Sequence, residues 1–501
     1  MPEIWTISLT ATGIGACALD TDGPRRSFSA PWPPFIKHNI RAIEPEAPRR
    51  LIAHALEALQ VKARALPLAI GISSPDRETA AFMDAHGDMQ LPIFTDPPIV
   101  VPRRDVPDKY ECDGALVTAY RQSVLRGLQT LDPGLAVNTH LGLYSLGAVA
   151  ARWLTGSPAS SSLPLGVPEH FPAFENMPQD MFFSALGVSR DLSMKRARCG
   201  HLVGKIRSDI VQSLRAFDMP ELSELAGIPV FDMGSSNAGR AYASAADPFS
   251  WSVTLGTDLR AHWTAGVTAL SAYELTVRDQ PDAQQDTNAP EIKEMTADEW
   301  TRAWHDVLPL SVEPGPGAER ACFGFTLPSI RASLFAHAFE KLGVSATVPL
   351  DIKTLQQSPV GSHGLHVIFD QQYARIVGLC AAHDDCDLAR AAFEGMCYAL
   401  KAYRERLDHG ADGPIRLILE QPWPQACAQW VADILDAKAY LIAEDEAALA
   451  AFGICLALMR LLEIPLAERP AMQATIIEPG TRCAYYARHY RIHCMLCDNQ
   501  T

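Results

Sequence analysis

The chain lacks a surplus of basic residues. Its 501 residues include 43 Lys and Arg against 58 Asp and Glu, which gives a formal net charge of −15 at pH 7. Nucleic acids and anionic membrane surfaces are bound through clustered Lys and Arg. We therefore expect neither as a main partner, and any site for a polyanion must supply its own local positive charge.

The chain also lacks a long hydrophobic run. The longest apolar stretch, residues 447–459, is too short to span a bilayer and predicts a buried helix. The first ten residues, MPEIWTISLT, show no basic segment ahead of a long apolar one, so no secretory signal is expected.

Paired cysteine motifs are scarce. The 12 cysteines are scattered, and several stand in apolar segments, which is typical of reduced core residues in a cytoplasmic protein. Cys494 and Cys497 have metal-ligand spacing, with His489 and His493 nearby. Because a second pair is missing, this is weak support for zinc, and we predict no metal ligand from the protein.

What is present is an ordinary globular composition, 48% hydrophobic and 20% charged, in a chain long enough for two domains. Strand patterns alternate with helix patterns in two similar halves. Each half opens on an apolar strand that runs into a Thr/Gly turn, at residues 4–15 and 251–257. The pattern predicts an α/β protein of two domains, 1–245 and 246–501, with a cleft between them.

The segment VFDMGSSNAG, residues 230–239, has the form of an active-site loop. An apolar strand runs into a turn of small residues, which lets the backbone approach a ligand closely. The turn also resembles the nucleophile elbow of hydrolases, but its second glycine comes one residue late and no triad partner can be named. Residues 13–18 fit a dinucleotide fingerprint, yet the strand and turn that follow favour a hairpin.

The order of short motifs along the chain resembles that of the FGGY carbohydrate kinases. The motifs are AIGIS, RWLTG, LGT, ARAAFEG and VADIL, at residues 69–73, 152–156, 255–257, 389–395 and 431–435. The resemblance spans nearly the whole chain. It implies two ribonuclease-H-like domains of the actin/hexokinase type around a central cleft, with the acceptor substrate on residues 1–245 and the nucleotide on residues 246–501.

The resemblance further implies ATP and Mg²⁺ as cofactors, and a small ketose or polyol whose hydroxyl is phosphorylated. Phosphoryl transfer needs a base for that hydroxyl, donors for the phosphates, and Mg²⁺ to neutralise charge. Thr12, Gly256, Thr257 and Gly453 stand at positions of the family's cofactor-binding motifs, and Asp96 at a substrate position. Asp76 and Arg77 stand in the family's sugar-contacting segment, where this sequence departs from the motif. For Gly453 the alternative is a role in helix packing. For Asp96, Asp76 and Arg77 the alternative is a place in an exposed turn or loop.

Several catalytic positions of that family hold other residues here. The position of the metal-linked aspartate holds Ser8, the basic position of the first hairpin holds Gly15, and the base falls on Ser236. A serine hydroxyl cannot accept a proton at neutral pH without a base of its own. Asp232 is an alternative base, although a strand-end carboxylate bonded to nearby backbone is the simpler interpretation.

Two functions therefore stay open. One is an active carbohydrate kinase, and the other is a pseudokinase or repurposed ligand-binding protein of the same fold, because fold does not fix function. Asp258 and Glu420 would add negative charge near a triphosphate, whereas Arg240 or Arg260 would add positive charge. Either function predicts a small polar ligand, a sugar or polyol. Homologues in the family are often dimers, so a homodimer is the oligomer that the resemblance suggests.

Overall fold

The protein is described from a computed structural model, and the chain divides into two compact units. Unit 1 comprises Met1–Ser244, Glu313–Ala318 and Glu444–Gln473, and unit 2 comprises Ala245–Val312, Glu319–Ala443 and Ala474–Thr501. The structure describes residues 3–10, 12–21, 26–33, 35–37, 40–61, 63, 65–75, 79–89, 92–95, 140–162, 188–189, 191–197, 199–210, 222–244, 251–256, 259–264, 310–313, 322–326, 351–369, 374–406, 415–420, 423–466 and 473–498.

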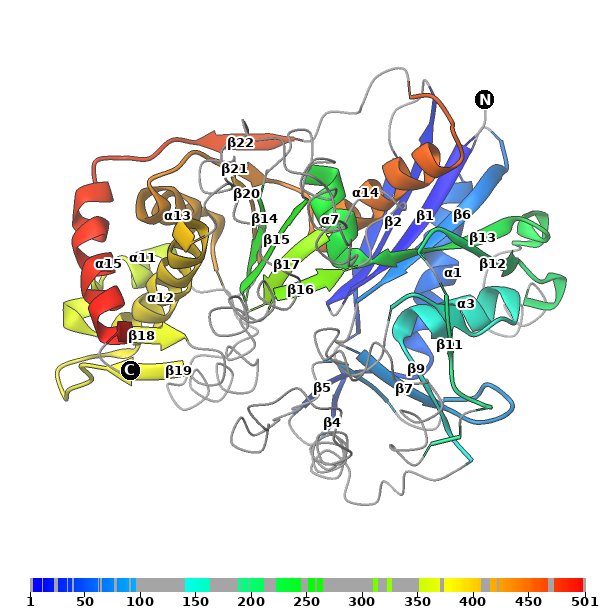
Figure 1. Ribbon diagram of the computed structural model, residues 1–501, viewed down its shortest axis with the longest axis horizontal. Coiled ribbons are helices and arrows are strands. Elements are labelled where there is room, and N and C mark those ends of the chain that lie inside the picture. Colours follow the sequence, from blue (N-terminus) through cyan, green and yellow to red (C-terminus); the bar gives the residue numbers. More distant parts are fainter. Residues whose placement is uncertain are drawn as a thin grey trace, which may run out of the picture. The chain divides into compact units, whose positions relative to one another are not determined.

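Unit 1 is built on a sheet whose described strands have the order β12-β13-β6-β1-β2-β3 (Figure 1). The strands β1, β2 and β3 form an antiparallel meander, β6 and β13 extend the β1 side in parallel, and β12 is antiparallel to β13. Their bounds are β1 Glu3–Leu9, β2 Gly13–Asp20, β3 Arg26–Pro31, β6 Pro67–Ser74, β12 His201–Lys205 and β13 Pro229–Ser235.

Both faces of β1 are covered, which explains why its sequence, EIWTISL, does not alternate cleanly between apolar and polar residues. Trp5 and Ile7 belong to the same apolar core as Ile52 of helix α1 (Ala47–Gln60). Thr6 points to the opposite face, where its hydroxyl donates to Ala451 O of helix α14 (Glu446–Leu461) at 2.7 Å. A helix therefore packs on each side of this strand.

The other described elements of unit 1 surround this sheet. A second sheet has the order β4-β5-β8-β7-β9, and β10 pairs with β11. Helix α3 starts at the cap Ser145, whose side chain accepts from Ala148 N. The bounds are β4 Ile36–Lys37, β5 Ile40–Ile43, β7 Thr79–Met83, β8 Ile93–Thr95, β9 Gly142–Tyr144, α3 Leu146–Thr155, β10 Ala159–Ser160, β11 Lys195–Arg196, the 3₁₀ turn η2 Ser223–Leu225 and α7 Ser236–Ser244.

Unit 2 repeats the strand order of unit 1. Its described strands run β16-β17-β15-β14-β20-β21-β22, in which β14 is antiparallel to β15, β15 to β17, and β14, β20 and β21 are parallel. The segment β17-β15-β14-β20-β21 thus matches β3-β2-β1-β6-β13 in order and direction. The prediction of two ribonuclease-H-like α/β domains is confirmed. The bounds are β14 Trp251–Leu255, β15 Leu259–Thr264, β16 Leu310–Glu313, β17 Cys322–Thr326, β20 Ile415–Leu419, β21 Ala439–Ile442 and β22 Ala474–Ile477.

Helices of unit 2 and the hairpin β18–β19 pack around a second core. Phe393 of α12 meets Trp423 and Trp430 edge-on, with ring centroids 5.0 and 5.8 Å apart. The bounds are α11 Ile352–Leu355, η3 Ser362–Gly364, β18 His366–Phe369, β19 Ala374–Val377, α12 Asp385–Arg406, η4 Gln425–Cys427, α13 Ala428–Leu435 and α15 Cys483–Asp498.

Helix α14 belongs to unit 1, although the sequence placed residues 246–501 in one domain. The predicted buried helix at 447–459 is confirmed as α14. It packs on β1, β2 and α7, and an added Cβ at Gly15 would lie 2.0 Å from Ala447 O. The helix completes the core of unit 1 through contacts with residues more than 400 positions away. No local sequence pattern predicts that the chain returns to unit 1 after residue 443. The predicted domain boundary at 245/246 therefore differs from the two units of the structure.

Two further features concern the surface and the length of the helices. Among the described residues, no helix combines the length and the apolar character needed to cross a membrane.

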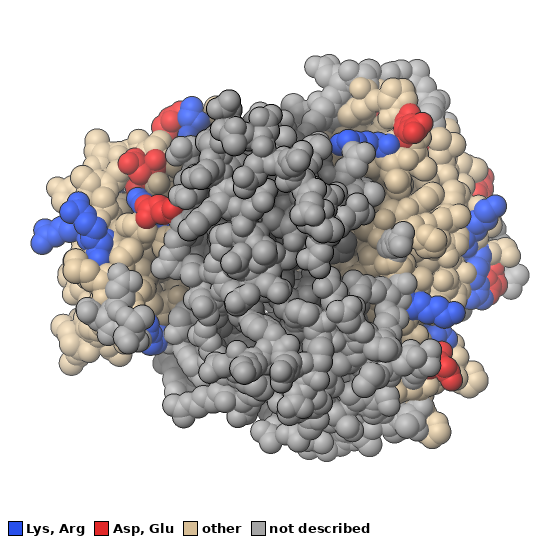
Figure 2. Space-filling model, viewed as in Figure 1, with Lys and Arg blue, Asp and Glu red and all other residues tan. Residues whose placement is uncertain are grey.

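On the face shown in Figure 2, the described Lys and Arg side chains are spread among acidic and other residues and do not gather into one patch. This distribution agrees with the net charge of −15.

The contact between α7 and α14 runs through two glycines. A Cβ added to Gly453 would lie 1.8 Å from Gly239 O, and one added to Gly239 would lie 2.7 Å from Ala450 O. We predict that Gly453→Ala destabilises unit 1 by about 2–3 kcal/mol or more, because both obstacles are backbone and the helices must separate. Chemical denaturation measures the loss. In the control Gly480→Ala, the nearest atom is a side-chain oxygen of Asp433 at 3.2 Å, and little change is expected.

Candidate functional site

Several backbone N–H groups of the β1–β2 hairpin are bonded within the hairpin itself. Thr10 Oγ1 accepts from Gly13 N at 3.0 Å and from Thr12 N at 3.3 Å, and it lies 3.1 Å from Thr12 Oγ1. The indole N–H of Trp32 donates to Thr10 O at 2.9 Å. A loop holds phosphate by aiming free N–H groups at it. Here two of those groups are directed at a threonine side chain, and Thr12, the predicted phosphate contact, is half-buried beside it.

Where the family has an aspartate linked to the metal, this chain has uncharged side chains. Ser73 Oγ of β6 donates to Ser8 Oγ of β1 at 2.9 Å, and both residues are buried. Mg²⁺ is bound in proteins chiefly by carboxylates, together with water and phosphate oxygens. A pair of hydroxyl groups offers no negative charge for that purpose.

Gly15, at the family's basic position, lies against the first turn of α14. A side chain there would meet Ala447 O at 2.0 Å and Ala448 N at 2.6 Å. The packing of α14 therefore excludes a lysine or arginine at this point of β2. The positive charge that a phosphate needs would have to come from another element.

The carboxylate of Asp232 is occupied by structural hydrogen bonds. It accepts from Ser161 N, from Ser161 Oγ at 3.1 Å and from Gly234 N at 3.0 Å. Asp232 is 5% exposed, and burial raises its pKa while the hydrogen bonds from Gly234 and Ser161 lower it. These contacts tie residues 160–162 to β13 and match the simpler interpretation of a strand-end carboxylate bonded to nearby backbone.

Ser236, at the position of the family's base, is the first residue of α7 and is 2% exposed. The end of β13 needs glycine, because Gly234 has φ 82°. Asn237 N donates to Ser235 Oγ at 3.1 Å, which closes the first turn of the helix. The predicted succession of strand and helix at residues 230–239 is confirmed, but β13 runs directly into α7 without a separate turn. Hydroxyl groups stand where the family carries a carboxylate base.

Arg240 lies in an ion pair within unit 1. Its guanidinium contacts the Glu446 carboxylate of α14 and donates to Asn237 Oδ1, and the two charged side chains are 1% and 2% exposed. The sequence offered Arg240 as a source of positive charge for a nucleotide. In the structure that charge is balanced by Glu446.

The structure describes Gly256 and Gly453, two of the predicted nucleotide positions of the second half, and also Glu420. Gly256 follows β14, is buried, and accepts a hydrogen bond at its carbonyl from the Trp423 indole. Glu420 is half-buried, and its N–H donates to Leu255 O at 2.8 Å. Gly453 is accounted for by its contact with Gly239, which is the helix-packing alternative. Outside the described residues lie Asp76, Arg77, Asp96, Thr257 and Asp258, and the side chain of Arg260.

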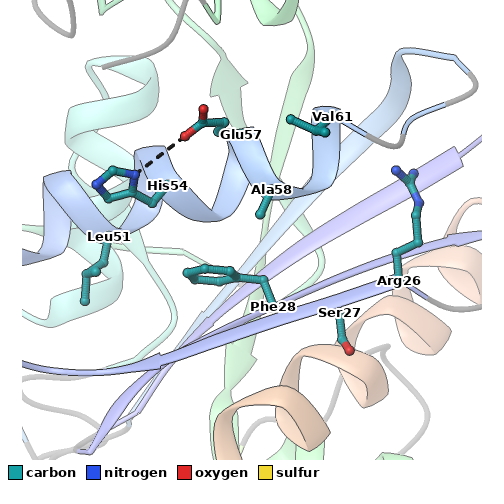
Figure 3. A pocket seen from close by; sticks show the side chains of 8 residues that line it. All are labelled: Arg26, Ser27, Phe28, Leu51, His54, Glu57, Ala58 and Val61. Carbon is teal, nitrogen blue, oxygen red and sulfur yellow. Dashed lines mark ion pairs between the residues drawn. The ribbon is translucent and has the colours of Figure 1, made fainter. Parts of the chain in front are cut away.

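A shallow pocket lies on the surface of unit 1. It opens between β3 and α1, has a volume of about 810 Å³, and none of the predicted site residues lines it (Figure 3). Its polar side chains include His54 and Glu57, whose nearest nitrogen and oxygen are 3.6 Å apart. The lining residues are Arg26, Ser27, Phe28, Leu51, His54, Glu57, Ala58 and Val61.

Sequence reasoning missed the partners that define this region. Ser73 and Ser161 have no motif of their own, and they meet Ser8 and Asp232 across 65 and 71 positions of sequence. The role of Thr10 could have been found, because a Ser or Thr side chain in a turn often accepts from the N–H groups two or three residues on.

No protein-family model and no curated protein matches the chain. Solved structures do match over almost the full length. They include a gluconate kinase and a ligand-bound xylulose kinase, both from Lactobacillus acidophilus, and a Plasmodium falciparum glycerol kinase with ADP. Their sequence identities are 16%, 14% and 11%, each with a TM-score of 0.59. The matches cover 99%, 100% and 100% of this chain and 98%, 98% and 99% of theirs.

These likenesses establish the architecture. The chain has the two-domain actin/hexokinase-like fold of the FGGY-type carbohydrate kinases, as the sequence predicted. At identities of 11–16% a likeness of this kind shows the fold alone. The activity has to be argued from the residues.

Proposed function

We propose that the chain is a ligand-binding relative of the FGGY carbohydrate kinases in which efficient phosphoryl transfer has been lost. The β1–β2 hairpin carries the proposal, because Thr10 takes up the N–H groups of Thr12 and Gly13. The Ser8–Ser73 pair and the packed Gly15 add to it, since they supply neither a metal-binding carboxylate nor a cation.

The expected loss of affinity for a phosphate follows from hydrogen-bond energies. A hydrogen bond to a charged group contributes about 1.5–3 kcal/mol. Two such donors withheld from a phosphate remove about 3–6 kcal/mol, which is roughly a 10²–10⁴-fold loss of affinity. The missing carboxylate and cation act in the same direction, so Mg·ATP should bind this chain far more weakly than an active kinase needs.

A sugar or polyol is the ligand class that the full-length match to structures of gluconate, xylulose and glycerol kinases supports. Ser73 and Ser74 end β6, Ser235 ends β13, and the loop residues Ser161 and Ser162 lie beside them. The Ser162 hydroxyl lies 3.3 Å from Gly234 O and 3.4 Å from Ser74 O, and it can donate to either. These hydroxyl groups are buried and largely bonded within the protein, so this region is uncharged and gives an anion little to bind.

An active kinase is the second candidate, and the full-length match to structures of carbohydrate kinases favours it. It would use ATP and Mg²⁺ and need a substitute for the missing base. Asp232 is that substitute only if it gives up its bonds to Ser161 and Gly234. Asp232→Asn would then abolish turnover, whereas a structural role would change stability and leave any measured turnover in place.

Calorimetry with Mg·ATP tests the proposal, with thermal shift as a second readout. We expect no binding to the wild-type protein at millimolar nucleotide. A sugar or polyol that binds should add about 2.7 kcal/mol of stability at a hundredfold its Kd. Saturable Mg·ATP binding with transfer of phosphate to any sugar would refute the proposal. Thr10→Gly serves as the matched variant, since it releases both N–H groups and should raise nucleotide affinity if the hairpin is the obstacle.

A further inference from the structure

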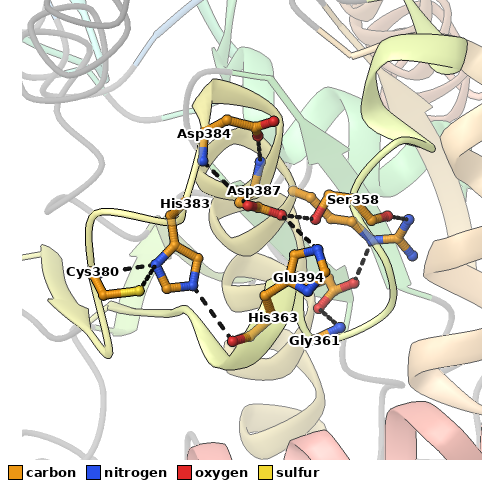
Figure 4. A network of polar contacts seen from close by, with 9 residues as sticks. Ser358, Gly361, His363, Cys380, His383, Asp384, Asp387 and Glu394 are labelled. Carbon is orange, nitrogen blue, oxygen red and sulfur yellow. Dashed lines mark hydrogen bonds and ion pairs between the residues drawn. The ribbon is translucent and has the colours of Figure 1, made fainter.

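One thiol in unit 2 stands apart from the other cysteines. Cys380 follows β19 and is exposed, whereas the remaining cysteines that the structure describes are buried or half-buried. It begins the turn Cys380–His383, which a hydrogen bond from His383 N to Cys380 O closes at 3.1 Å. The turn places the thiol and the imidazole side by side, as Figure 4 shows.

The imidazole of His383 is held from both sides. Its Nδ1 accepts from Cys380 N at 3.0 Å and lies 3.3 Å from Cys380 Sγ, and its Nε2 lies 3.5 Å from His363 O. A backbone N–H can donate to Nδ1 only if that nitrogen carries no proton, so the ring proton sits on Nε2 and points to His363 O. Nδ1 therefore accepts from the Cys380 N–H and lies within reach of the Cys380 thiol on the same side of the ring.

The surroundings of this pair are negatively charged. Asp384 and Asp385 follow at the start of α12, and both are exposed. The pKa of the nearby Cys386 thiol is raised, first by burial and then by the charges of Asp384, Asp385 and Asp387. The negative charge at the start of α12 therefore acts on neighbouring thiols. An electrophile with positive charge would be attracted to this turn, and an anionic one would be repelled.

We propose that Cys380 and His383 form a site of thiol–disulfide exchange with small, positively charged disulfides. His383 Nδ1 takes the thiol proton, and the Cys380 thiolate attacks one sulfur of the disulfide. The S–S bond of the reagent breaks as the new bond to Cys380 Sγ forms, and the departing thiolate receives the proton from the imidazolium. Cys380 is oxidised to a mixed disulfide and half of the reagent is reduced to a thiol.

The site shares no residue with the predicted nucleotide and sugar positions. Its residues come from the turn after β19, the start of α12 and the turn before β18, all within unit 2. An exposed thiol beside an oriented base is activated by that base, while the negative charges of Asp384 and Asp385 act against the thiolate and draw cationic reagents to it. Mixed-disulfide formation at this turn would add a bulky, charged group beside Leu379, which is 60% exposed.

The test follows the exchange rate at single cysteines by mass spectrometry at pH 6.5. The probes are cystamine, 2-hydroxyethyl disulfide and dithiodiglycolate, which are cationic, neutral and anionic. In the wild-type protein we expect Cys380 to react fastest, with cystamine ahead of the other two, and the cystamine advantage to shrink with added salt. Cys483, whose Sγ donates to Gly480 O at 2.9 Å, is the internal reference.

His383→Asn is the matched variant. Its side-chain oxygen can still accept from Cys380 N, so the turn should persist, but it cannot take a proton. We expect cystamine to react with Cys380 about tenfold or more slowly at pH 6.5, with a steeper rise of rate with pH and an unchanged rate at Cys483. Equal rates in the two proteins, or a wild-type preference for dithiodiglycolate, would overturn the proposal. Asp385→Asn should lower the cystamine rate without slowing the neutral probe.

Discussion

Replacing Arg240 with methionine should lower the free energy of unfolding of unit 1 by about 3–5 kcal/mol, because it leaves the Glu446 carboxylate buried without its counter-charge. The two side chains are 1% and 2% exposed, and they link α7 to the first turn of α14. Urea denaturation measures the loss. The effect concerns the stability of unit 1 and would arise in the absence of any ligand.

The double variant Arg240→Met/Glu446→Leu separates a charge effect from a packing effect. Removing both charges should recover most of the loss, because well-packed apolar residues often replace a buried ion pair at little cost. The exposed pair Arg207–Asp209 is the control, with side chains 47% and 56% exposed. Arg207→Met should change stability by about 1 kcal/mol or less. A loss at Arg240 no greater than that at Arg207 would show that the buried pair is not essential.

The second large effect is a change in how the stability of unit 2 depends on pH. Glu394 of α12 accepts from Arg390 Nε at 2.8 Å and from Gly361 N at 3.0 Å. Burial raises the pKa of Glu394 to about 7, although Arg390 lowers it. Burial lowers the pKa of His493 in α15 to about 4, and His366 acts in the same direction.

The two groups act with opposite sign. Glu394 has a raised pKa, so its contribution is fully present below pH 4.5 and is lost as the pH rises towards 7. His493 has a lowered pKa, so its contribution is present above pH 6.5 and is lost as the pH falls towards 4. Between pH 4.5 and 6.5 the two dependences oppose each other. Across this window, each group changes the free energy of unfolding of unit 2 by something on the order of 2–3 kcal/mol.

Glu394→Gln should therefore expose the histidine contribution. We expect the stability of this variant to rise with pH between 4.5 and 6.5 more steeply than that of the wild type, by on the order of 2–3 kcal/mol across the window. His493→Phe should shift the slope the other way. His366 and His489, whose pKa values burial also lowers, keep part of the histidine effect in that variant.

Hydrogen exchange of the α12 amides at pH 4.5, 5.5 and 6.5 reports this stability without a signal from unit 1. Tyr398 lies between the two groups, with its ring centroid 5.3 Å from that of His493, and it does not titrate in this window because burial raises its pKa. Parallel pH profiles for the wild type and Glu394→Gln would show that Glu394 does not bind a proton in the folded state.

Much of the fold could be predicted from local pattern. Residues 69–73 read as a buried strand and lie in β6, and residues 230–239 read as a strand, turn and helix and form the end of β13 and the start of α7. Such signals are strong because a strand or helix is specified by neighbouring residues that share one periodicity. The order of strands and helices in the two halves then sufficed for two α/β domains.

The candidate site was harder to predict, because its chemistry depends on which residues meet. The sequence showed that Ser8, Gly15 and Ser236 stand where charged groups were expected. It could not show that Thr10 takes up two N–H groups of its own hairpin, since that depends on backbone geometry. It offered Asp232 as an alternative base and favoured a carboxylate bonded to nearby backbone, but it could not name the partners Ser161 and Gly234.

The sequence by itself determined the succession of elements, the net negative charge and the absence of the usual catalytic groups at their positions. Only the tertiary structure decided where residues 444–473 pack and what becomes of Arg240. The reason is physical: periodicity and turn preferences act between neighbours, whereas the ion pair of Arg240 with Glu446 and the packing of Gly15 under Ala447 join residues some 200 and 430 positions apart. Those contacts exist only once the chain has folded, and they occupy the groups that phosphoryl transfer would need.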